Sequence, residues 1–83
     1  MTFEQLIDLI RANQQEELGF LQTKILSYSW EGKTYATLAE ELHYREVYVK
    51  NAAYKLWQLV SDLLGMPVTK SNFRSIVEQY VII

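Results

Sequence analysis

The chain has 83 residues, with eight basic and ten acidic side chains and a formal net charge of −2. It has no cysteine, which excludes a disulfide framework and a thiolate metal site. No apolar run approaches the ~20 residues that cross a bilayer, and the N-terminus lacks the basic-then-apolar pattern of a signal peptide, so we expect a cytoplasmic protein without a membrane segment.

The first half of the chain predicts two helices. Thr2 and Gln5 have the spacing of a capping box, which marks a helix N-terminus. Apolar residues then recur at helical spacing, namely Phe3, Leu6, Ile7 and Ile10. Residues 13–19 are polar and end in glycine, which is typical of a link. The second helix has Leu21, Ile25 and Tyr28 on one face, and Gly32 is its expected C-terminal cap.

The segment that follows predicts a short helix, a tight turn and a long helix. Thr34 is a suitable N-cap for the short helix. The expected inner positions of this helix are Tyr35, Leu38, Ala39 and Leu42. His43 and Tyr44 form the turn, and the long helix runs from about Arg45 to Leu64, roughly 30 Å. Its expected buried positions are Val49, Ala53, Leu56, Val60 and Leu63. Gly65 and Pro67 end it.

A last helix is predicted after this stop. Thr69 or Ser71 caps it, and its inner positions are Phe73, Ile76, Val77 and Tyr80. The apolar end, residues 81–83, either packs on the core or marks the point where a longer protein was cut. The predicted fold is therefore all-α, a single helix-turn-helix domain over residues 1–83 with about five helices and one long recognition-type helix.

The spacing of the short and long helices is that of a helix-turn-helix, whose second helix can enter a DNA major groove. Ala39 and Ala53 are small enough for a close crossing of the two helices. The side chains left on the outer face of the long helix are of types that contact bases and phosphates. They are Arg45, Glu46, Lys50, Asn51, Tyr54, Lys55 and Gln58. Lys33 and Thr34 are candidates to hold a flanking phosphate.

The same residues allow other interpretations. Lys, Asn and Gln also form ordinary solvated faces, and a free-standing DNA-binding domain is usually basic, whereas this chain is acidic. Residues 43–83 hold five basic and three acidic side chains, so the positive charge is only modest there. Tyr44, Tyr48 and Tyr54 lie near the turn, where exposed aromatics suit a protein interface and where one of them is expected to be partly buried.

No enzyme or cofactor signature is found. The only histidine, His43, has no acid partner in the sequence, and there is no glycine loop for a nucleotide and no metal-ligand spacing. The acid pairs at 16–17 and 40–41 are expected to be solvated. Trp30, Trp57 and Phe73 are expected to be core anchors and not a ligand cage.

Three short motifs carry a resemblance: WEGKTY at residues 30–35, LWQL at 56–59 and VTKSNF at 68–73. With them, residues 20–79 resemble the vWA-MoxR-associated protein N-terminal domain, a helix-turn-helix-like family of cyanobacteria. At the level of fold, residues 34–60 are similar to region 4 of sigma factors and to LuxR-type regulators. The family resemblance implies an N-terminal module of a larger signalling protein, ahead of NB-ARC or AAA-type ATPase modules and WD40 or TPR repeats.

Two residues depart from the usual helix-turn-helix pattern. His43 stands where glycine is common, but histidine tolerates the left-handed backbone better than most residues. Arg45 stands where Ser, Thr or Asp usually caps the recognition helix, which costs a capping bond of about 1 kcal/mol. Two hypotheses remain: a regulatory module that reads DNA, and a module that docks a protein partner or a second copy as a homodimer.

Overall fold

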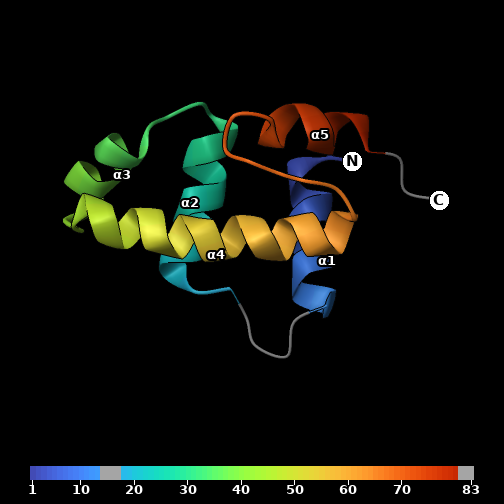
Figure 1. Ribbon diagram of the computed structural model, residues 1–83, viewed down its shortest axis with the longest axis horizontal. Coiled ribbons are helices and arrows are strands. Elements are labelled where there is room, and N and C mark those ends of the chain that lie inside the picture. The colour runs from blue at the N-terminus through green and yellow to red at the C-terminus, as the bar shows by residue number, and fades with distance from the viewer. Residues whose placement is uncertain (14–17, 81–83) are drawn as a thin grey trace.

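The computed structural model describes residues 1–13 and 18–80, and within these ranges it contains helices and no strand (Figure 1). The five helices are α1 (Phe3–Asn13), α2 (Phe20–Trp30), α3 (Tyr35–Leu42), α4 (Glu46–Leu64) and α5 (Phe73–Gln79). The all-α prediction is confirmed. Most of the expected link at 13–19 and the apolar end at 81–83 lie outside the described residues.

The helix boundaries follow the local signals of the sequence. The Thr2 hydroxyl accepts from the Gln5 amide at 3.1 Å, and the Gln5 side chain accepts from the Thr2 amide at 2.8 Å, which completes the capping box. The Thr34 hydroxyl accepts from the Thr37 amide at 3.1 Å and caps α3. Gly65 ends α4 in the left-handed conformation, with φ of 70°.

One boundary prediction and one burial prediction need correction. The residue at the N-cap of α5 is Asn72, not Thr69 or Ser71, and its side chain makes no capping bond to α5. Instead, Thr69 and Asn72 bond each other: the Thr69 amide donates to Asn72 Oδ1 at 2.7 Å, and the Asn72 amide donates to Thr69 Oγ1 at 3.4 Å. This reciprocal pair closes a separate turn just before α5. At the end of α4, Leu64 is buried and Leu63 is only half-buried.

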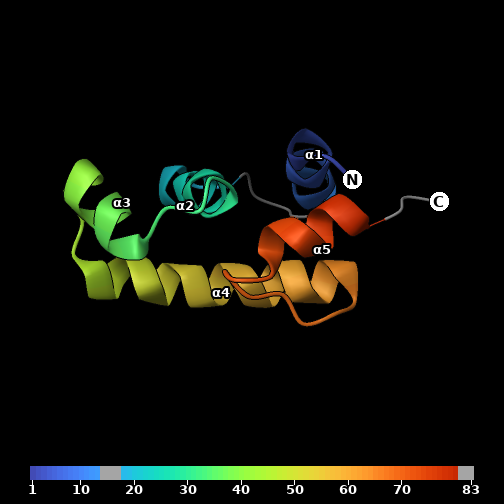
Figure 2. The ribbon, with the colours of Figure 1, turned by 90° about the horizontal axis from the view of Figure 1, so that it is seen from above.

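α4 forms one layer of the molecule, and the other helices lie on one side of it (Figure 2). α1, α2 and α3 contact α4, and α5 covers α1 and α2. The core between them is aliphatic, with Leu56 and Val60 of α4 fully buried. The other fully buried large side chains are Leu6, Ile10, Ile25, Leu26, Leu38, Val49, Phe73 and Val77.

An aromatic cluster links four of the helices. The ring centroids of Phe3 and Trp30 are 5.2 Å apart, those of Trp30 and Phe73 are 5.7 Å apart, and those of Phe73 and Trp57 are 4.9 Å apart. The Trp57 indole donates to the Tyr35 hydroxyl at 2.7 Å, and burial raises the pKa of Tyr35. The prediction that the two tryptophans and Phe73 anchor the core is confirmed.

Candidate functional site

α3 and α4 form the predicted helix-turn-helix corner. Ala39 is 5% exposed and Ala53 is 1% exposed, as expected for small residues at a close crossing. His43 adopts the left-handed conformation with φ of 60°, and the amide of Tyr44 donates to the Ala39 carbonyl at 2.9 Å. This bond closes α3 at the turn, so that only three residues separate the end of α3 from the start of α4.

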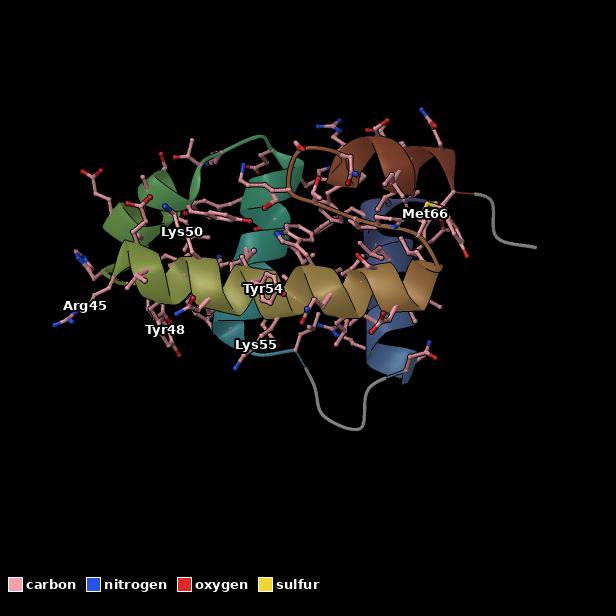
Figure 3. All side chains as sticks on the ribbon, in the orientation of Figure 1. Arg45, Tyr48, Lys50, Tyr54, Lys55 and Met66 are labelled. Carbon is pink, nitrogen blue, oxygen red and sulfur yellow. The ribbon has the colours of Figure 1, made fainter. Side chains whose placement is uncertain are left out.

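The face of α4 that points away from the other helices is open to solvent. Every residue predicted for this surface is exposed, namely Arg45, Glu46, Lys50, Asn51, Tyr54, Lys55 and Gln58. In Figure 3, Tyr54 lies toward the viewer, Tyr48 and Lys55 project from one edge of α4, and Lys50 projects from the other. The structure therefore brings the predicted α4 residues onto one exposed surface, which we call the outward face.

The charges on the outward face are partly neutralised. Lys50 Nζ lies 3.3 Å from Glu46 Oε1, one helical turn away, in an exposed ion pair. Arg45 is the N-cap residue and makes no side-chain capping bond, as predicted. Among the described residues, no salt bridge includes Arg45 or Lys55. The positive charge of this face therefore comes mainly from Arg45 and Lys55 and not from Lys50.

Lys33 and Thr34 are engaged elsewhere. Lys33 Nζ lies 3.2 Å from Glu31 and 4.9 Å from the ring centroid of Tyr28. The hydrogen bond with Glu31 raises the pKa of Lys33. The Thr34 hydroxyl is already used in capping α3. Both residues lie in the segment between α2 and α3 (Figure 1), and among the described residues no hydrogen bond or ion pair joins them to α4.

Sequence reasoning missed one apolar residue of the outward face. Val47 is 63% exposed, with Tyr48 at 56% and Tyr54 at 66%. Val47 precedes Asn51 by four residues and Tyr54 by seven, a spacing that places the three on one side of a helix. This helical spacing was the signal in the sequence that could have indicated the exposure of Val47. Tyr48 stacks on the half-buried Tyr44, with ring centroids 5.8 Å apart, so one of the three tyrosines does have a partly buried role.

The two halves of α4 differ in what lies beside them. Residues 67–69 flank the C-terminal half and form a shallow groove with Tyr54, Trp57 and Gln58. Ser61 holds this segment, since its hydroxyl accepts from the Val68 amide at 2.8 Å. Beside the first turns of α4 lie α3 and Tyr44, which stacks on Tyr48, while Val47, Lys50 and Asn51 stay exposed.

The described residues include no group of three His, Cys, Asp or Glu side chains that could bind a metal ion. His43 is exposed at the turn, where its role is set by its backbone conformation. Glu40 is exposed, and Glu41 accepts a hydrogen bond from the Tyr28 hydroxyl, which raises the pKa of Tyr28. Of the predicted acid pairs, the one at 16–17 lies outside the described residues. Among the described helices, none is long and apolar enough to span a bilayer.

Comparison with known families agrees with this geometry. The family model described as "vWA-MoxR associated protein N-terminal HTH" matches residues 1–80, which extends the predicted resemblance to α1. No curated protein matches the chain. No solved structure matches it either.

Proposed function

Since the chain belongs to the vWA-MoxR associated protein N-terminal helix-turn-helix family, and is thus a helix-turn-helix module of regulatory type, we propose that it binds duplex DNA through the outward face of α4. The observation that supports this is the exposure of Asn51, Lys55 and Gln58 on the side of α4 that points away from the other helices. A major groove about 12 Å wide admits one such helix.

The proposal assigns different roles to the exposed side chains. Asn51 and Gln58 have the donors and acceptors that pair with adenine edges, and Arg45 and Lys55 are placed to contact phosphates. The ion pair between Glu46 and Lys50 limits the positive charge. We therefore expect weak binding that depends on salt and on the rest of the protein. In this proposal the module works in the cytoplasm and passes a signal to ATPase or repeat domains that follow it.

A charge-reversal variant tests the proposed face. Lys50→Glu combined with Lys55→Glu should abolish a salt-dependent mobility shift on duplex DNA while the helical circular dichroism stays unchanged. The matched control is Arg11→Glu with Lys24→Glu, which makes the same charge change on α1 and α2 and should keep binding. Equal binding by both double variants would reject the face.

A second function is favoured by a specific observation, the exposure of Val47, Tyr48 and Tyr54 on the same helix. Exposed aromatic residues are enriched at protein interfaces. In this alternative the outward face docks a protein partner or a second copy of the chain. This alternative predicts that the domain self-associates or retains a partner in 0.5 M salt, an ionic strength at which contacts to phosphate would be lost. The double variant Tyr48→Ala with Tyr54→Ala should weaken that association.

A further inference from the structure

We infer that Val47 and Asn51 act together as the base-reading pair of α4 and select a site with neighbouring A·T base pairs. This inference rests on the proposed function, because it requires that α4 enters the major groove. It goes further by assigning sequence preference to two residues.

The two side chains are placed as a pair on the outward face. Val47 is 63% exposed and Asn51 is exposed, and both lie in the first two turns of α4, on the side opposite the buried Val49 and Ala53. Residues four apart lie on the same side of a helix, about 6 Å apart along its axis. The Asn51 amide makes no hydrogen bond to another side chain or to the backbone among the described residues beyond those of the helix itself.

The chemistry of each side chain selects one partner of an A·T pair. An asparagine amide pairs in two-point fashion with N6 and N7 of adenine, and an apolar side chain packs on the C5 methyl group of thymine. Successive base pairs are about 3.4 Å apart along the duplex. A separation of about 6 Å on the helix therefore brings the two side chains to the same base pair or to one of its near neighbours.

The neighbouring residues do not compete for this role. Lys50, which would otherwise favour guanine, is paired with Glu46 at 3.3 Å and projects from the edge of α4. Arg45 at the N-cap extends the positive charge toward the phosphates. A protein partner fits this part of the face less well, because the polar Asn51 lies between Val47 and Tyr54 along the helix and the Glu46–Lys50 ion pair lies beside Val47.

The test begins with selection of binding sites from a random duplex library by the wild-type domain. We expect enriched sites to contain adjacent A·T pairs. Asn51→Ala should then lose about 5- to 100-fold in affinity for the selected site. Replacing the selected thymines by deoxyuridine removes only the methyl group, and should weaken wild-type binding about three- to fivefold.

The variant Val47→Ala makes the test specific. It should bind the thymine site more weakly than the wild type and should no longer distinguish thymine from deoxyuridine, whereas the control Val47→Ile should still do so. Salt-dependent binding without A·T enrichment, or an equal uridine effect in wild type and Val47→Ala, would overturn the inference and leave the proposed function standing. Absence of binding to any duplex, or a dimer that Val47→Glu disrupts and that excludes DNA, would overturn both.

Discussion

The inward and outward faces of α4 carry apolar residues for different reasons. On the inward face, Val49, Leu56 and Val60 are fully buried against α1, α2 and α3. On the outward face, Val47 and Tyr54 are more than 60% exposed. Burial explains the first set completely, since apolar area removed from water stabilises the fold by roughly 25 cal/mol per Å². Folding provides no comparable reason for the second set, which is why we assign it to binding.

The largest expected effect is on the inward face. Leu56→Ala removes a fully buried side chain between packed helices and should destabilise the domain by about 2–5 kcal/mol, a large part of the stability of a small domain. Urea unfolding followed by circular dichroism measures it. Gln58→Ala, on the opposite face, is the control and should stay within about 0.5 kcal/mol. A loss for Leu56→Ala no greater than that of the control would contradict the described core.

The crossing of α3 and α4 is the next most sensitive point. Ala53→Leu adds volume where the side chain is 1% exposed, and overpacking should cost about 1–3 kcal/mol. The melting temperature should fall accordingly. A variant as stable as the parent would mean that the two helices do not approach at Ala53.

The hydrogen bond between Trp57 and Tyr35 shows how much a polar contact contributes on the inward side of α4. Tyr35→Phe leaves the buried indole N–H without its acceptor and should cost about 1–2 kcal/mol. Burial raises the pKa of Tyr35 above its ordinary value of 10.0, so the folded state keeps a proton that the unfolded state releases. The stability from this group is therefore present below pH 10.0 and is lost as pH rises through the folded-state pKa.

Unfolding of the parent and of Tyr35→Phe at increasing alkaline pH measures this. The parent should lose stability more steeply than the variant. Identical slopes would show that the Tyr35 hydroxyl is equally hydrated in the folded and unfolded states.

The N-terminus of α4 offers a gain in stability. Arg45 has the extended backbone of an N-cap, with φ of −76° and ψ of 137°, but makes no capping bond. Arg45→Asp should supply that bond and stabilise the domain by about 1 kcal/mol, seen as a higher melting temperature, whereas Arg45→Ala should not. No difference between the two variants would place the start of α4 at another residue.

The smallest effect on stability is expected on the outward face. Val47→Ala should change the free energy of unfolding by no more than about 0.5 kcal/mol, because the side chain is mostly in water. Thermal melts check this directly. A loss near that of Leu56→Ala would show that Val47 is covered, and the contrast between the two faces would fail.

Much of the fold could be predicted because its signals are local. His43, in the turn between α3 and α4, and Gly65, at the end of α4, have the left-handed backbone that was expected there. Leu63 was predicted to be buried from a seven-residue repeat, but a helix of 3.6 residues per turn drifts by about 20° per heptad, which moves Leu64 into the core instead. The α5 cap was misplaced because the side chains of Thr69 and Asn72 each accept a hydrogen bond from the other residue's backbone amide and close a turn of their own.

The candidate site was less predictable. The exposure of Asn51 and Lys55 followed from helical phase alone, and it is confirmed. Val47 has the same helical phase as Asn51 and Tyr54 and was missed because it is apolar; phase alone does not show that no other segment packs on it, which depends on the tertiary arrangement. The use of Lys33 in an ion pair with Glu31 also depends on the geometry of a loop.

If α4 enters a major groove as proposed, the hydrogen bond from the Val68 amide to Ser61 limits how much of this helix can face the bases. The segment it fixes lies beside α4 beyond Tyr54, so the nine residues from Glu46 to Tyr54 would seat most deeply in a groove and Gln58 would reach only its edge. At 1.5 Å per residue this is about 13 Å, or roughly four base-pair steps. A single copy could then recognise only a short word that recurs often in any genome, so selective targeting would need two or more copies held at a fixed spacing.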